Sequence, residues 1–277
     1  MKQKKYISRN YKLFWAFLVV LLLFTNCVEI EAQELNKRIK ANHKVYKPAG
    51  DGPFPVILAI PGCSGVSLNG PETDAGRPGD EGDRLFRRHY SRMALRLQEA
   101  GFMVLLVDYL TADGVPNTCG WEIHPKRVGE YIKEAISFVK TIPYGDSTRI
   151  NVIGWSHGGE GVLSWLAKLE GEPNGVQSVI AVYPGCSSSS QWISSIPVLM
   201  ILGEDDDIAL PYICNTLVET LPDQTNVLVK SYPQARHGFD LTEGPTLLSV
   251  GKGLTIGRNM KAGNNAWEEI FKFLNKN

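Results

Sequence analysis

Short apolar runs alternate along the chain with longer segments in which apolar residues recur every three or four positions. Seven runs have the length of β-strands, and most are nearly continuous: 44–46, 56–60, 103–107, 150–153, 179–182, 198–202 and 227–232. A continuous apolar strand is typical of a parallel sheet that helices bury on both faces. The pattern predicts an α/β fold with a mostly parallel central sheet, helices on both faces and these strands in central positions.

Amphipathic helices are predicted between the strands. Apolar residues keep helical spacing in 128–139 and 267–274, and helices also fit 85–100 and 161–169. Gly101 is well placed to end the helix at 85–100 in a left-handed conformation. A glycine- and proline-rich stretch, 63–83, interrupts this rhythm, and loops of that length are often functional or disordered.

The N-terminus has a different composition from the rest of the chain. Five basic residues precede any acidic residue, and an apolar run, 13–24, follows them. This arrangement favours a secretory signal, because a spanning helix needs about 20 apolar residues. We predict an N-terminal segment, 1–32, that is a cleaved signal, a lipoprotein signal with Cys27 as the acceptor, or an uncleaved membrane anchor. A single domain, 33–277, follows, and the protein is expected to be exported to the periplasm or secreted.

Charge and cysteine content narrow the choice of partners. The 29 basic residues balance 29 acidic ones, so no nucleic-acid partner is expected. Exported chains keep disulfides, and one bridge is plausible among the four cysteines after the N-terminal segment, with all three pairings open. These are Cys63, Cys119, Cys186 and Cys214.

A glycine-flanked serine follows one of the predicted strands. Gly154-Trp155-Ser156-His157-Gly158 lies between the strand at 150–153 and the helix at 161–169. This strand–turn–helix setting makes G-x-S-x-G a nucleophile elbow, a tight and strained turn that exposes the serine hydroxyl. Ser156 is therefore the candidate nucleophile.

A serine hydroxyl needs a base near neutral pH, and the base needs a carboxylate to orient it. His237 follows the strand at 227–232, and the acidic run 204–207 follows the strand at 198–202. Both segments lie at carboxyl ends of strands, and the chain order Ser, Asp, His is the order used with this type of elbow. We predict a triad with His237 as general base and Asp206 or Asp207 as the acid. A calcium site in the acidic run is the weaker alternative.

Backbone N–H groups are expected to stabilise a developing oxyanion. The N–H of His157 follows the nucleophile, and Pro61-Gly62-Cys63-Ser64-Gly65 follows an earlier strand. We predict that the N–H groups of Cys63 and His157 form an oxyanion hole, with Gly62 allowing close approach of the substrate. A thiol nucleophile at Cys63 is the competing interpretation.

Together these segments resemble the dienelactone hydrolase family of α/β-hydrolases over almost all of the predicted domain. The matching segments are 61–65, 107–109, 149–150, 154–159, 183–186, 203–207 with Pro211 and Cys214, and 235–239. The resemblance implies the α/β-hydrolase fold, hydrolysis of an ester or lactone, and a triad of Ser156, Asp206 and His237. Family spacing to Cys214 favours Asp206 as the acid, whereas spacing to Pro211 suits Asp207.

The chain departs from the family in two respects. Dienelactone hydrolases carry a cysteine where this chain has Ser156, which weakens the case for dienelactone as the substrate. Many relatives are cytoplasmic and carry histidine where this chain has Pro61. We therefore predict a serine hydrolase of small-molecule esters or lactones that needs no cofactor or metal. Arg77, Arg84 and Arg236 suggest a substrate carboxylate, and the alternatives are a peptidase, an acyltransferase or a catalytically silent binding protein.

Overall fold

The computed structural model describes most of the chain after residue 41. The described residues are 14–15, 17, 33–35, 37–40, 42–67, 70, 79–171, 173–187, 191–222 and 226–277. They fall into two units, Met1–Arg38 and Ile39–Asn277. In the first unit, Phe14, Trp15 and Phe17 are helical and exposed.

The predicted signal segment lies largely outside the described residues, as do Cys27 and Ala32. Within the residues that the structure describes, no helix combines the length and the apolar character needed to cross a membrane. The choice between a cleaved signal, a lipoprotein signal and an anchor therefore stays a prediction.

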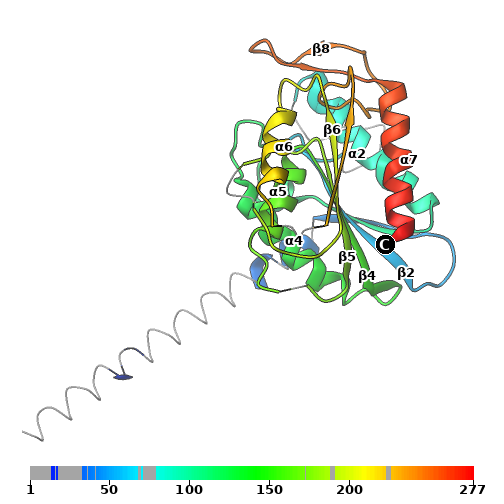
Figure 1. Ribbon diagram of the computed structural model, residues 1–277. Helices are drawn as coiled ribbons and strands as arrows, with labels where there is room; N and C mark the ends of the chain where they lie inside the picture. Colours follow the sequence, from blue (N-terminus) through cyan, green and yellow to red (C-terminus); the bar gives the residue numbers. More distant parts are fainter. Residues whose placement is uncertain are drawn as a thin grey trace, which may run out of the picture. The chain divides into compact units, whose positions relative to one another are not determined.

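A twisted sheet forms the centre of the Ile39–Asn277 unit (Figure 1). Its seven described strands follow the order β1-β3-β2-β4-β5-β6-β7, and every neighbouring pair is parallel except β1 and β3. The strands are β1 (His43–Tyr46), β2 (Phe54–Ile60), β3 (Met103–Val107), β4 (Gly145–Trp155), β5 (Val176–Val182), β6 (Val198–Gly203) and β7 (Val227–Tyr232). The predicted α/β architecture with a mostly parallel sheet is confirmed.

Two strands differ from the expectation that all are central. β1 and β7 lie at the two edges of the sheet, and β1 runs antiparallel to β3. Both edge strands keep partly exposed side chains, whereas β3 and β6 are buried along their whole length. Apolar residues on an edge strand still bury one face against a helix, so their runs resemble those of central strands.

Helices cover both faces of the sheet. Figure 1 shows α2 (Glu81–Glu99) and α7 (Met260–Lys276) on one side, and α4 (Pro125–Val139), α5 (His157–Leu166) and α6 (Pro211–Glu219) on the other. The Asp80 side chain caps the start of α2 by accepting from the N–H of Asp83 at 2.9 Å. Gly101 follows α2 with φ +93°, as predicted, because glycine enters the left-handed region without steric cost.

Several short elements were not predicted. α3 (Tyr109–Ala112) and α6 are brief, and β8 (Leu248–Ser249) with β9 (Thr255–Ile256) forms a small antiparallel pair. A helix of one turn, such as α3, or a strand of two residues has too few positions to show a period, and α6 has only nine residues. Of these elements, α6 and β9 contribute residues to the site described below.

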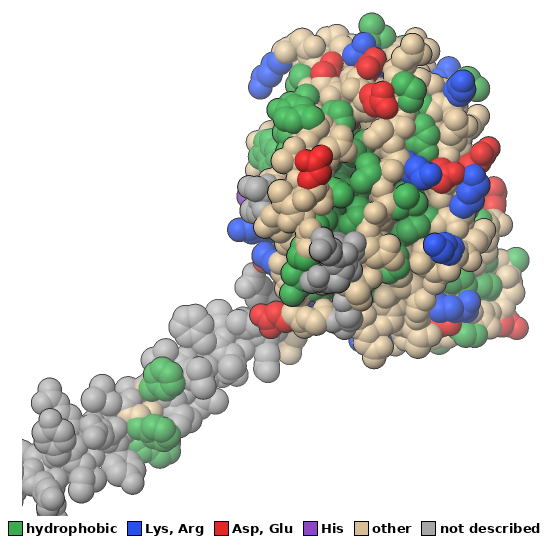
Figure 2. All heavy atoms as spheres, in the orientation of Figure 1, with side chains coloured by type: hydrophobic (Ala, Val, Ile, Leu, Met, Phe, Trp, Pro, Cys, Tyr) green, Lys and Arg blue, Asp and Glu red, His purple; other side chains and the backbone are tan. Residues whose placement is uncertain are grey.

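Two disulfides close loops at the carboxyl edge of the sheet, where one bridge was expected. Cys63 pairs with Cys119, and Cys186 pairs with Cys214. On the face of the domain shown in Figure 2, Lys and Arg side chains are interspersed with Asp and Glu side chains. The mixture of charges on that face agrees with the equal numbers of basic and acidic residues in the chain.

Candidate active site

Ser156 occupies the sharp turn between β4 and α5. Its backbone has φ 51° and ψ −120°, a combination that a residue with a side chain adopts only at an energetic cost. The turn also excludes side chains beside the serine. A Cβ on Gly158 would lie 2.3 Å from the carbonyl oxygen of Pro61, and a Cβ on Gly154 would lie 2.5 Å from that of Gly158. The local sequence therefore projects Ser156 from the carboxyl end of β4, as a nucleophile elbow does.

His237 and Asp206 meet this serine from neighbouring loops. The Ser156 hydroxyl lies 2.9 Å from His237 Nε2, and His237 Nδ1 lies 2.7 Å from Asp206 Oδ2. Asp206 Oδ1 accepts from the N–H groups of Ile208 and Ala209 at 2.9 and 2.8 Å. A carboxylate only accepts hydrogen bonds, so Nδ1 carries the proton and Nε2 presents its lone pair to the serine.

Asp207, the alternative acid, contacts a different part of the protein. Its carboxylate accepts from the Thr255 N–H at 2.9 Å and from the Thr255 hydroxyl at 2.6 Å, and it lies 3.7 Å from Arg236 Nη1. These contacts hold the Asp207 carboxylate against β9, whereas His237 bonds to Asp206. Within the described residues, no group of three or more His, Cys, Asp or Glu side chains is arranged to hold a metal ion.

The two predicted oxyanion donors border the nucleophile. Cys63 and His157 line the same cavity as Ser156. In the described loops and caps, the backbone N–H groups of Cys63 and His157 donate to no backbone carbonyl. His157 is the first residue of α5, and the first N–H of a helix has no partner within the helix. A Cβ on Gly62 would lie 3.2 Å from Ser156 Cβ, so glycine permits the close approach. The thiol interpretation of Cys63 is wrong, because its sulfur is bonded to Cys119.

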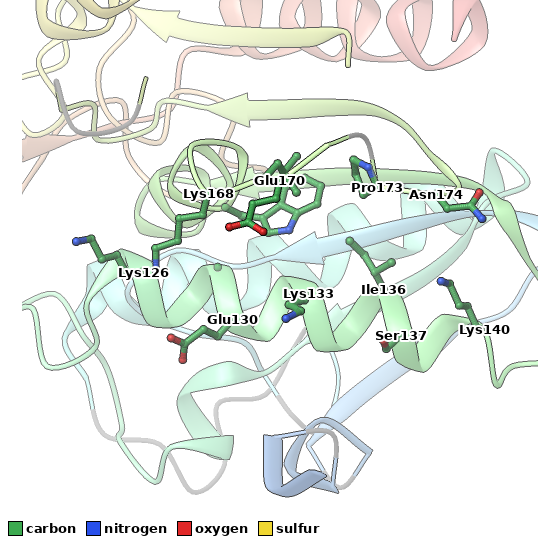
Figure 3. Close-up of a pocket in the computed structure, with 13 residues that line it drawn as sticks. Lys126, Glu130, Lys133, Ile136, Ser137, Lys140, Lys168, Glu170, Pro173 and Asn174 are labelled. Atoms are coloured by element: carbon green, nitrogen blue, oxygen red, sulfur yellow. The ribbon is translucent and has the colours of Figure 1, made fainter. Parts of the chain in front are cut away.

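Two cavities meet at Ser156. One has a volume of about 270 Å³ and extends along α5, and the other has about 420 Å³ and is bordered by α2 and β9. A larger cavity of about 580 Å³ lies between α4 and the end of α5, where several lysines surround it (Figure 3). It contains no triad residue, so size does not identify the site.

The predicted arginine contacts to a substrate carboxylate find no support. Arg84 donates to the Gly79 carbonyl at 2.9 Å, and Arg236 donates to the Thr255 hydroxyl at 3.0 Å. Neither of these two arginines lines a cavity that contains Ser156. Arg77 lies outside the described residues.

A buried carboxylate behind His237 was not predicted. Asp240 accepts from the Tyr183 hydroxyl at 2.7 Å, and from His89 Nε2 and Trp267 Nε1 at 3.2 Å each. Burial alone would raise the pKa of Asp240, but the His89 charge and these three hydrogen bonds outweigh it and lower that pKa. The Tyr183 ring lies edge-on to the His237 ring with centroids 4.8 Å apart. The network therefore supports one wall of the His237 ring.

We expect Asp240→Ala to lower the free energy of unfolding by about 3–5 kcal/mol, because it leaves three buried polar groups without their acceptor. Glu243→Ala is the matched control. Like Asp240, Glu243 accepts from more than one side chain: Arg88 lies at 2.6 Å and Arg92 at 2.7 Å. Here, however, all three side chains are partly exposed. Its loss should cost below about 1 kcal/mol. Equal losses for the two variants in denaturant unfolding would contradict this assignment.

Comparison with known sequences identifies the family of the chain. The sequence profile of the dienelactone hydrolase family matches residues 86–277. Among curated proteins, no sequence matches the chain. The match begins within α2, runs to residue 277 and includes Ser156, Asp206 and His237.

Solved structures share the fold at low sequence identity. A candidate dienelactone hydrolase from Klebsiella pneumoniae has 16% identity and a TM-score of 0.59, covering 85% of this chain and 92% of its own. A dienelactone hydrolase-like promiscuous phosphotriesterase from metagenomic libraries has 16% identity and a TM-score of 0.63, covering 84% and 91%. A candidate dipeptidyl aminopeptidase IV from Bacteroides ovatus has 18% identity and a TM-score of 0.55, covering 85% of this chain and 33% of its own. This chain belongs to the dienelactone hydrolase family and is a hydrolase of the α/β type.

Proposed function

We propose that this protein hydrolyses carboxylic esters or lactones through an acyl-enzyme on Ser156. The observation that carries the proposal is the continuous hydrogen-bonded series from the Ser156 hydroxyl through His237 to Asp206. His237 and Asp206 are 3% exposed, so water competes little with either hydrogen bond. Ser156 lines both cavities where a substrate would bind, and His237 lines the larger of these two.

Acylation begins when His237 Nε2 removes the Ser156 proton. The serine oxygen then attacks the substrate carbonyl carbon, and Asp206 stabilises the imidazolium that forms. The proton on Nε2 passes to the leaving alkoxide, which departs as an alcohol. In a lactone, the alcohol stays attached to the acyl group.

Deacylation repeats these steps with water. His237 takes a proton from water, the hydroxide attacks the acyl carbonyl, and the proton returns to Ser156 as the acid leaves. In both half-reactions the oxyanion would accept from the N–H groups of Cys63 and His157. Fixed donors of this kind stabilise the transition state because they need no reorganisation when charge develops.

Amide hydrolysis and transfer to another acceptor use the same elementary steps, so fold and triad favour a reaction class rather than one substrate. One structural neighbour is described as a dipeptidyl aminopeptidase and another as a phosphotriesterase. A substrate panel of esters, lactones, peptide amides and a phosphotriester compares these activities directly. We expect esters or lactones to have the highest kcat/KM.

The first experiment is hydrolysis of a short-chain p-nitrophenyl ester by the domain, together with labelling by a fluorophosphonate probe. We expect turnover and one covalent adduct, located on Ser156 by peptide mass spectrometry. A protein that neither cleaves the ester nor reacts with the probe would instead fit a catalytically silent binding protein.

We also propose that the protein is exported. The basic and apolar N-terminal residues support export, and so do the two disulfides, because such bonds persist mainly in oxidising compartments. Membrane attachment through the N-terminal segment is the alternative to cleavage. The substrate would then be a small ester or lactone found outside the cytoplasm.

A further inference from the structure

The smaller of the two cavities at Ser156 contains an unpaired carboxylate. Glu160 lies one helical turn beyond the nucleophile on α5, and its N–H donates to the Ser156 carbonyl at 3.0 Å. Its side chain packs against Gly185, where a Cβ would lie 2.6 Å from Glu160 Oε2. Glycine at this position leaves the space that the carboxylate occupies.

No basic side chain neutralises Glu160 from within the cavity. Five described segments line it, and apart from disulfide-bonded cysteines their only titratable side chains are Glu160 and His157. Burial lowers the pKa of His157 to about 4, so this imidazole is neutral near pH 7. Glu122 and His124 act electrostatically on His157. Burial raises the pKa of Glu160 to about 7 and is the sole cause of this shift.

An exposed aromatic side chain borders the same cavity. Trp121 is 60% exposed and has φ 71°, a conformation that is unfavourable for a residue with a side chain. Its N–H donates to the Thr118 carbonyl at 2.9 Å, and the Cys63–Cys119 disulfide secures this turn beside the oxyanion loop. The turn that carries Trp121 is therefore held beside the cavity, and the indole lies edge-on to the His157 ring with centroids 5.7 Å apart.

A carboxylate and an indole are the side chains that proteins use to bind ammonium groups. The carboxylate supplies the opposite charge, and the electron-rich indole face attracts a cation within about 6 Å. The cavity volume of about 270 Å³ suits a small group rather than a whole drug-sized ligand, which typically needs ~300–1,000 Å³.

We propose that Glu160 and Trp121 bind an ammonium group of the substrate, so that the enzyme prefers esters with a positive charge near the scissile bond. This inference rests on the proposed ester hydrolysis at Ser156. It places the reacting carbonyl at Ser156, the cationic part of the substrate in the smaller cavity and the remainder in the cavity of about 420 Å³.

The test compares cationic esters with uncharged isosteres in which a tert-butyl group replaces trimethylammonium. One pair carries this group on the alcohol, as in acetylcholine, and a second pair carries it on the acyl part of a p-nitrophenyl ester. The readout is the ratio of kcat/KM, cationic over neutral, within each pair. We expect this ratio to be above about ten in at least one pair at pH values well above 7.

Glu160→Gln should lower that ratio about tenfold, because the amide keeps the shape and removes the charge. Trp121→Leu should lower it about threefold, since an exposed cation–π contact is weaker. Glu219→Gln, on the exposed side of α6, is the matched control and should leave the ratio unchanged. In the unaltered protein the ratio should fall as the pH drops through about 7, because Glu160 becomes protonated and neutral. Taking a ratio within each pair cancels any effect of pH that acts on both esters alike.

The outcomes separate the two proposals. If both members of each pair are hydrolysed equally well, or if the Glu160→Gln and Trp121→Leu ratios match that of the unaltered protein, the ammonium site is wrong while ester hydrolysis stands. If neither member is hydrolysed in either pair and p-nitrophenyl acetate is also inert, the proposed function fails and the ammonium site fails with it.

Discussion

Ser156→Ala is expected to lower kcat for a p-nitrophenyl ester by about 10⁶-fold, the scale seen when a serine hydrolase loses its nucleophile. The remaining hydroxyls near the site do not take its place, because Ser156 alone stands on the strained turn with its oxygen 2.9 Å from His237 Nε2. Fluorophosphonate labelling should disappear in the same variant. The measurement is initial-rate kinetics together with intact-protein mass spectrometry.

Ser249→Ala provides the matched control, because this serine is exposed on β8. It should retain the activity and the label. Circular dichroism and thermal unfolding should show that Ser156→Ala is folded, and the strained backbone at this position is left unaltered by the change. Ser156→Ala activity within tenfold of the unaltered protein would refute the acyl-enzyme proposal.

Asp206→Asn is expected to lower kcat by about 10⁴-fold. An asparagine side chain carries no negative charge to stabilise the imidazolium, and its NH₂ group can face His237 and favour the unproductive tautomer. Asp207→Asn serves as the comparison variant, because Asp207 bonds to Thr255 and not to His237. We expect it to change kcat less than tenfold while moderately lowering stability.

The two substitutions therefore distinguish neighbouring carboxylates of the same acidic run. The effects of the two substitutions are best compared by measuring kcat as a function of pH. Loss of the carboxylate that orients the general base is expected to change the pH dependence of kcat. A larger loss in Asp207→Asn than in Asp206→Asn would reverse the assignment of the acid.

Patterns of local residues predicted much of the architecture. The apolar runs located all seven described strands of the sheet, and the helical spacing located α2, α4 and α7. The edge positions of β1 and β7 were missed because an apolar run reports burial of its side chains and not the number of hydrogen-bonded neighbours. The predicted helices at 85–100 and 128–139 began later than α2 and α4 do, because the cap residue Asp80 and the first-turn Pro125 start these helices before their apolar stripes begin.

The local motif likewise predicted Ser156 and the order Ser, Asp, His, but it left Asp206 and Asp207 as alternatives. Adjacent residues in a loop point in different directions, and which one faces His237 depends on how the whole loop is held. Here the N–H groups of Ile208 and Ala209 orient Asp206 while Thr255 binds Asp207. Cysteine pairing depends in the same way on distances between loops that are far apart in sequence.

By itself the sequence determined the fold class and singled out Ser156 as the candidate nucleophile, because both depend on short-range patterns of apolar residues and glycines. Only the tertiary structure showed that Asp206 rather than Asp207 contacts His237, and it alone decided the disulfide partners, the network around Asp240 and the placement of Glu160 with Trp121. His89 and Asp240 are 151 positions apart, yet they share a hydrogen bond at 3.2 Å. Such contacts follow from packing of the complete core, which brings together side chains that no local period relates.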